Sequence, residues 1–164
     1  MVTHQSHLEE INAYDVPGLH IVEHEIRVPL NHQEPDHRTI TVFARTLKAI
    51  KAKHEERPIL VYLQGGPGFQ CQRPTRRGGW IDRALDEFHV MLIDQRGTGR
   101  STPVCHRTLL TQGDHKQQAD YLSYFRADSI VADCEIIRKI VLGKDEKWHI
   151  LGQSFGGFCA LTYL

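Results

Sequence analysis

The stretch Gly152-Gln153-Ser154-Phe155-Gly156 decides the fold because of what lies on either side of it. The apolar segment Trp148-His149-Ile150-Leu151 precedes it and predicts a buried strand, and the Gly- and Ala-rich segment from Phe155 to Leu164 predicts a helix. A Gly-x-Ser-x-Gly sequence between a strand and a helix predicts a sharp turn that holds the serine hydroxyl clear of the sheet edge. Side chains at 152 and 156 would collide in such a turn, so we predict that Ser154 is a nucleophile.

A second glycine-rich loop, Gly65-Gly66-Pro67-Gly68, follows the apolar run Ile59-Leu60-Val61-Tyr62-Leu63, which predicts a buried strand. Backbone N–H groups in such a loop can reach the oxygen of a substrate that reacts with the serine. We predict Gly66 as the first choice of oxyanion donor and Gly65 as the second, with the N–H of Phe155 completing the oxyanion hole. Gly65 and Gly66 are also the predicted substrate-binding residues.

The rest of the chain predicts an α/β domain. Alternating patterns predict an antiparallel hairpin whose first strand is half-exposed, and later apolar runs predict parallel strands with helices between them. The expected strands are 20–28, 39–47, 59–63, 89–93 and 148–151, and the expected helices are 80–88, 116–125, 129–142 and 155–164. Asp128 is the expected N-cap of the third helix, and 103–113 is expected to be a loop. Residues 1–18 are expected to be an irregular lead-in, and 19–164 to form the domain.

Composition narrows the possible partners. The chain has 164 residues, 20 Lys and Arg against 20 Asp and Glu, and a formal net charge of zero, which argues against a nucleic-acid partner. No apolar run approaches the ~20 residues of a membrane span, and Met1 to Tyr14 lacks the apolar core of a signal peptide. The four cysteines are widely spaced and predict free thiols in a reducing cytoplasm.

Neither a cofactor nor a metal is expected. The segment Asp94-Gln95-Arg96-Gly97-Thr98-Gly99-Arg100-Ser101 lacks the third glycine of a dinucleotide-binding loop, and the chain has no phosphate-binding Gly-Lys-Ser/Thr sequence. We predict that Asp94 and Arg96 instead order the loops around the serine turn through charge-assisted hydrogen bonds. His20 and His24 are too far apart along a strand to share a metal ion, and the histidines up to His37 are expected to be solvated.

Together, the motifs at 64–68, 94–101 and 152–157 closely resemble the proline iminopeptidase (prolyl aminopeptidase) family of α/β-hydrolases. The segments 28–45 and 125–130 resemble the longer branch of that family, so the resemblance covers nearly the whole chain. It implies that Ser154 is the nucleophile and that Phe155 and Gly66 donate to the oxyanion. It also implies that proline is released from the N-terminus of a peptide substrate through an acyl-enzyme. Gln64 stands where the family usually has His.

The resemblance also implies that the chain is the N-terminal part of an α/β-hydrolase fold, ending shortly after the nucleophile. In this fold the acid and the histidine of the triad follow the serine, but Phe155 to Leu164 contains neither. We therefore expect the cap domain and C-terminal half to be absent, and the isolated chain to be inactive. Its strand 148–151 would then be an exposed, aggregation-prone sheet edge. Two alternatives stay open, another α/β-hydrolase such as an esterase and a non-catalytic remnant that acts as a binding fragment.

Overall fold

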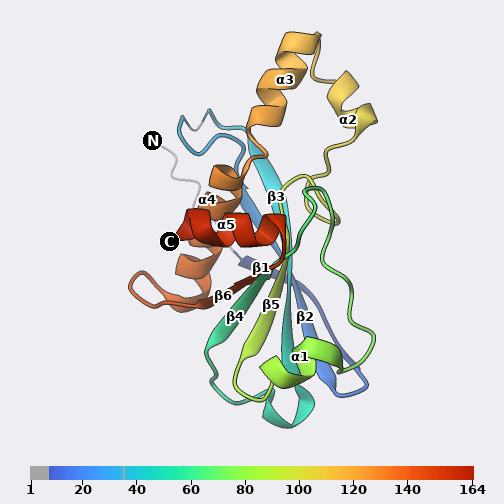
Figure 1. Ribbon diagram of the computed structural model, residues 1–164, viewed down its shortest axis with the longest axis vertical. Helices are drawn as coiled ribbons and strands as arrows, with labels where there is room; N and C mark the ends of the chain where they lie inside the picture. Colours follow the sequence, from blue (N-terminus) through green and yellow to red (C-terminus); the bar gives the residue numbers. More distant parts are fainter. Residues whose placement is uncertain (1–7, 35) are drawn as a thin grey trace.

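The protein is described by a computed structural model that covers residues 8–34 and 36–164. In these residues six strands form one sheet in the order β1-β2-β3-β5-β4-β6 (Figure 1). Neighbours from β1 to β5 run antiparallel, whereas β4 pairs in parallel with β5 and β6. The strands are β1 (Leu8–Val16), β2 (Leu19–Pro29), β3 (Thr39–Ala49), β4 (Ile59–Leu63), β5 (His89–Asp94) and β6 (His149–Gly152).

Helices cover both faces of this sheet. The helical elements are η1 (Ile50–Ala52), α1 (Gly79–Ala84), α2 (His106–Leu110), α3 (His115–Ser123), α4 (Ala127–Leu142) and α5 (Phe155–Tyr163). Val61 and Leu63 of β4 belong to the apolar core with α4 and α5, whereas Tyr62 belongs to the core with the α1 segment. Because side chains alternate along a strand, α1 lies on the opposite face of the sheet from α4 and α5.

The mixed α/β architecture with an antiparallel opening and parallel strands confirms the predicted fold class. Strand β4 has the predicted bounds, and β2 and β3 pair along their whole length as the expected hairpin. The Gly-rich loop after β4 and the serine turn after β6 lie at the same end of the sheet, because these two strands are parallel neighbours.

The segment between β5 and α4 departs from the prediction. A short helix, α2, occupies part of 103–113, where a loop was expected. Figure 1 shows α2 and α3 projecting past the end of the sheet, away from the layers that the other helices form. The α4 helix begins at Ala127 with Arg126 as its N-cap residue, so the prediction that Asp128 caps it was wrong. Asp128 lies instead in the first turn, where a carboxylate interacts favourably with the helix dipole.

Residues 8–16 were also assigned incorrectly to an irregular lead-in. They form β1, which pairs with β2 through a register shift between Glu10 and Asn12, while residues 1–7 of that expected segment lie outside the described residues. Strand β2 pairs with β1 on one side and with β3 on the other, and it is buried over most of its length rather than half-exposed. The apolar sequence of β6 is typical of a buried strand, but β6 lies at the sheet edge with Leu151 41% exposed, as expected for a chain that ends shortly after the serine.

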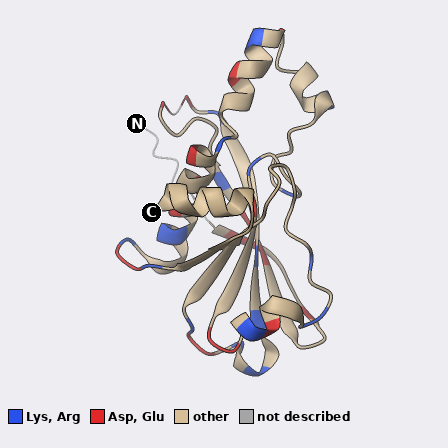
Figure 2. Cartoon of the chain, viewed as in Figure 1, with Lys and Arg blue, Asp and Glu red and all other residues tan. Residues whose placement is uncertain are grey.

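Charged residues show no concentration on a single element. Figure 2 shows Lys and Arg interspersed with Asp and Glu, including on α1, where Asp82 and Arg83 are neighbours in sequence. Among the described residues, no helix combines the length and the apolar character that crossing a membrane requires.

Candidate active site

Ser154 occupies the turn between β6 and α5, in a backbone conformation that few residues adopt. Its φ of 52° and ψ of −118° lie outside the common regions for a residue with a side chain. Such a conformation costs on the order of 1–3 kcal/mol and persists only where the surrounding structure enforces it. Ser154 is solvent-exposed, and α5 begins at the next residue, so the positive end of the helix dipole lies beside the serine.

Close backbone packing explains the glycines on both sides of Ser154. A Cβ atom added at Gly156 would lie 1.9 Å from the carbonyl oxygen of Leu63 in β4, and one added at Gly152 would lie 2.3 Å from the carbonyl oxygen of Gly156. The predicted collisions at 152 and 156 are therefore confirmed. By contrast, a Cβ at Gly157 would lie 3.6 Å from its nearest neighbour, the carbonyl oxygen of Gly152.

The loop after β4 lies directly against the serine. A Cβ atom added at Gly65 would lie 3.0 Å from the Cβ of Ser154 and 3.6 Å from its Oγ. The N–H of Gly65 donates to the side-chain oxygen of its neighbour Gln64 at 2.8 Å. Gly66 has a φ of 125°, in the region that favours glycine, and its N–H donates no hydrogen bond within the described part of the chain.

Polar side chains at the ends of β4, β5 and β6 hold the two loops together. The hydroxyl of Tyr62 donates to Gln153 Oε1 at 2.6 Å and lies 3.1 Å from Gln64 Oε1. The Nε2 of Gln95 donates to the Gln64 carbonyl at 3.0 Å. Burial raises the pKa of Tyr62, so the phenol stays protonated and available as a donor. Gln64, which stands where the resembled family usually has His, thus holds the loop through its side-chain oxygen.

The predicted structural role of Asp94 is confirmed by its hydrogen bonds. Its two carboxylate oxygens accept the backbone N–H groups of Cys71, at 2.9 Å, and Arg100, at 3.0 Å. Burial and the nearby Asp94 raise the pKa of the Cys71 thiol to about 12, which keeps this thiol protonated. Asp94 therefore links two loops near the serine, and Cys71 is not a competing nucleophile.

Arg96 ties the same loop to α4. Its Nε donates to Asp133 Oδ2 at 2.7 Å and its Nη2 to Oδ1 at 2.6 Å, with both side chains almost fully buried. Its Nη1 donates to the carbonyls of Leu30 and Tyr124, and its Nη2 donates also to the carbonyl of Pro29. His32 was expected to be solvated, but its Nε2 lies 2.7 Å from Asp133 Oδ1 and its side chain is only 15% exposed.

Among the described residues, no histidine or carboxylate is hydrogen-bonded to Ser154. His89 and His149 begin β5 and β6, at the opposite end of these parallel strands from the serine, and His106 begins α2. His89 Nε2 lies 2.9 Å from the Glu55 carbonyl. In residues 8–34 and 36–164 no three side chains of the metal-binding types gather.

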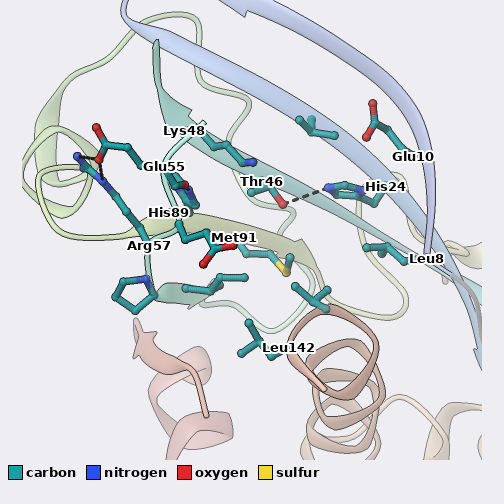
Figure 3. Close-up of a pocket in the computed structure, with 15 residues that line it drawn as sticks. Leu8, Glu10, His24, Thr46, Lys48, Glu55, Arg57, His89, Met91 and Leu142 are labelled. Atoms are coloured by element: carbon teal, nitrogen blue, oxygen red, sulfur yellow. Dashed lines mark hydrogen bonds and ion pairs between the residues drawn. The ribbon is translucent and has the colours of Figure 1, made fainter. Parts of the chain in front are cut away.

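A cavity of about 720 Å³ lies at the end of the sheet opposite Ser154. Figure 3 shows the side chains that line it. The first residues of β4 and β5, Ile59 and His89, line it together with His24, Thr46 and Lys48. His24 is 8% exposed, and its Nε2 lies 3.1 Å from Thr46 Oγ1. The cavity shares no lining residue with the serine turn.

The fold and the serine turn define the class of protein. Residues 58–164 match the family model for the alpha/beta hydrolase fold, and the chain belongs to this family. Solved structures at low identity agree in fold. The 2-hydroxy-6-oxo-6-phenylhexa-2,4-dienoate hydrolase from Rhodococcus sp. strain RHA1 has a TM-score of 0.50 at 22% identity, covering 87% of this chain and 41% of that one. An epoxide hydrolase from hot-environment metagenomes has a TM-score of 0.50 at 20% identity, covering 84% and 35%.

Within this class, the chain is similar in sequence to proline iminopeptidases. It is 58% identical to the proline iminopeptidase of Aeromonas sobria, over 92% of this chain, and 43% identical to proline iminopeptidase aneH of Aspergillus aculeatus, over 93%. The chain spans 35% of the length of each of these relatives. A proline iminopeptidase of Xylella fastidiosa matches only 63% of this chain at 36% identity. These matches confirm the resemblance that the sequence motifs indicated.

Two residues around the site, Tyr62 and Asp133, were not predicted from the sequence. Tyr62 was counted only as an apolar strand residue, although a hydroxyl at the buried carboxyl end of a strand requires a polar partner. Asp133 was not predicted as the partner of Arg96. Its position on the core-facing side of an otherwise apolar helix stripe, with Ile130, Cys134 and Ile137, was the available signal.

Proposed function

We propose that the chain carries the nucleophile and oxyanion hole of a serine aminopeptidase that releases proline from the N-terminus of peptides. One observation carries the proposal. Ser154 is held in a strained turn between Gly65 and the start of α5, in a chain 58% identical to the proline iminopeptidase of Aeromonas sobria. The strained turn supports a serine nucleophile, and the relatives support the substrate class.

In this proposal, Ser154 Oγ attacks the carbonyl carbon of the N-terminal proline and forms a tetrahedral intermediate. The N–H groups of Phe155 and Gly66 donate to its oxyanion, whereas the Gly65 N–H is already engaged by Gln64. Collapse of the intermediate breaks the peptide C–N bond, and the shortened peptide leaves as an amine. Water then attacks the acyl-enzyme and releases free proline and the serine hydroxyl.

Both steps need a general base that takes the proton from Ser154 or from water and returns it to the leaving group. No described histidine or carboxylate is hydrogen-bonded to Ser154, so we propose that residues 1–164 by themselves turn over no substrate. In the relatives, the length beyond the part matched here provides room for that base and its carboxylate.

A hybrid protein tests the proposal. In this hybrid, residues 1–164 replace the matching part of the Aeromonas sobria enzyme. We expect the hybrid to hydrolyse proline β-naphthylamide, and Ser154→Ala to lower kcat by about 10⁶-fold without changing the circular dichroism spectrum. The Ser154→Ala variant therefore controls for activity that does not depend on the proposed nucleophile.

A short-chain p-nitrophenyl ester separates the alternatives. Hydrolysis of the ester alone would overturn the aminopeptidase assignment in favour of an esterase. A folded hybrid that hydrolyses neither substrate would favour a non-catalytic binding fragment. Appreciable turnover by residues 1–164 alone, abolished by Ser154→Ala, would contradict the need for a base from outside them.

We also propose that the enzyme works in the cytoplasm, where cysteines stay reduced. All four cysteines, Cys71, Cys105, Cys134 and Cys159, are free thiols, and only Cys105 is exposed. Fractionation of cells that express the protein, followed by immunoblotting, tests this location. Recovery in the culture medium or the periplasm would contradict it.

A further inference from the structure

A groove of about 510 Å³ opens beside the serine turn. Phe155, Phe158 and Thr162 of α5 form one wall. The other sides are formed by Pro67 of the glycine-rich loop and by the segment 125–128, which includes the start of α4. The volume falls within the range of small-molecule and peptide-binding sites.

The α5 wall of the groove is continuous along one helix face. Residues 155, 158 and 162 lie three and then four positions apart, so their side chains follow one another along the same face. From Phe155 to Thr162 the helix rises about 10 Å, the length of about three extended residues. The rings of Phe155 and Phe158 are stacked, with centroids 6.1 Å apart, and Phe158 is 60% exposed.

The groove begins at the groups that would hold the oxyanion. Phe155, whose N–H is one of the proposed oxyanion donors, follows Ser154 directly and lines the groove. Pro67 likewise follows Gly66, the other proposed oxyanion donor. A substrate that reacts at Ser154 therefore has its scissile bond at one end of the groove.

The chemistry of an aminopeptidase indicates which half of the substrate the groove holds. When a single N-terminal residue is released, the acyl half is one proline, and the rest of the peptide is the leaving half. A site that extends for about three residues is too long for one proline ring and matches an extended peptide. We propose that this groove binds the leaving half of the peptide, and that Phe158 selects an apolar side chain on the residue after the scissile bond. This inference rests on the proposed function.

The hybrid protein tests this inference with two substrates, Pro-Phe-amide and Pro-Gly-amide. We expect Phe158→Ala to lower kcat/KM for Pro-Phe-amide about tenfold and to leave that for Pro-Gly-amide within about twofold, because glycine offers no side chain to the ring. Leu110→Ala is the matched control. Leu110 is 61% exposed, like Phe158, but lies on α2 and does not line the groove. Phe158→Leu should retain part of the preference.

A binding measurement separates failure of the subsite from failure of the proposed function. Calorimetry on the Ser154→Ala hybrid, which needs no turnover, should show phenylalanine amide binding more tightly than glycine amide. Phe158→Ala should remove most of that difference. If binding depends on Phe158 but the parent hybrid cleaves no peptide, the subsite stands and the aminopeptidase proposal falls. Equal losses on both substrates, or no change on either, would overturn the subsite.

Discussion

Two loops, which follow strands β5 and β6, lie at the same end of the sheet, and they use their polar groups in opposite ways. In the Asp94–Ser101 loop the carboxylate of Asp94, the guanidinium of Arg96 and the hydroxyl of Ser101 are at least 98% buried and all hydrogen-bonded. In the Gly152–Gly156 turn, Ser154 is exposed, and its hydroxyl donates to no described residue.

The difference separates a structural loop, Asp94–Ser101, from the turn that carries the proposed nucleophile. Burying a polar group without its hydrogen bonds would lower the stability of the fold. The polar groups of the Asp94–Ser101 loop are therefore structural, because each is buried and hydrogen-bonded within the protein. Ser154 is held in an unfavourable conformation, and its hydroxyl makes no hydrogen bond to the described residues. Such a cost is retained where the side chain acts on something else. Both segments contain two glycines and a serine, so residue types alone do not distinguish them.

The largest expected effect on stability comes from removing the guanidinium of Arg96 from the Asp94–Ser101 loop. Arg96→Met leaves the carboxylate of Asp133 buried without its partner, which should destabilise the hybrid protein by about 3–5 kcal/mol. The measurement is the urea concentration at half unfolding. Arg38→Met is the control, because its ion pair with Asp36 is exposed and should contribute little.

Adding Asp133→Leu to Arg96→Met should recover part of the lost stability, because the unpaired charge is then removed as well. If Arg96→Met costs no more than Arg38→Met, the hydrogen bonds of the Asp94–Ser101 loop do not stabilise the fold.

The comparison also shows what sequence could and could not predict. The strand before Gly65, the turn at Ser154 and the steric need for Gly152 and Gly156 follow from local patterns, and the structure agrees with them. The pairing of Arg96 with Asp133 depends on where α4 packs against the loop, which no local pattern contains. Strand β1 was missed because as an edge strand it is mostly solvent-exposed, so its residues alternate only weakly between polar and apolar.

The next prediction concerns the close packing under the serine turn. Gly156→Ala would place a Cβ atom 1.9 Å from the Leu63 carbonyl oxygen, so the turn must shift. We expect a loss of about 1–3 kcal/mol in stability, together with a fall in kcat, because Ser154 moves with the turn.

Gly157→Ala is the matched control, because its added Cβ would make only an ordinary contact of 3.6 Å. Alanine in a helix is favoured over glycine by up to about 1 kcal/mol, so this variant should be neutral or slightly stabilised. Equal effects of the two substitutions on unfolding midpoint and kcat would show that packing does not hold the turn in place.

A smaller effect is expected at Gln64, which holds the glycine-rich loop after β4 without being buried in the core. Gln64→Ala removes the acceptor of the Gly65 N–H and one partner of Tyr62. We expect kcat of the hybrid on proline β-naphthylamide to fall about tenfold, which corresponds to ~1.4 kcal/mol of transition-state stabilisation, with the unfolding midpoint nearly unchanged. Gln64→His, the residue usual in the family, should retain most of the activity. A stability loss that accounts for the lower rate would place Gln64 with the structural loop instead.

The smallest expected effect is on the pH dependence of stability, and it concerns His24, a buried residue of the cavity at the opposite end of the sheet. Burial lowers the pKa of His24 below its ordinary value of 6.5, so the folded protein favours the neutral imidazole. The unfolded chain takes up a proton near pH 6.5, and the stability that neutral His24 contributes is therefore present above that pH and is lost as pH falls below it. As the pH falls from 7 to 5.5, the free energy of unfolding should decrease less in the His24→Gln variant than in the parent hybrid, by about 1 kcal/mol or less. Between pH 7.5 and 8.5 the two proteins should show parallel profiles, and identical profiles over the whole range would show that His24 does not titrate on unfolding.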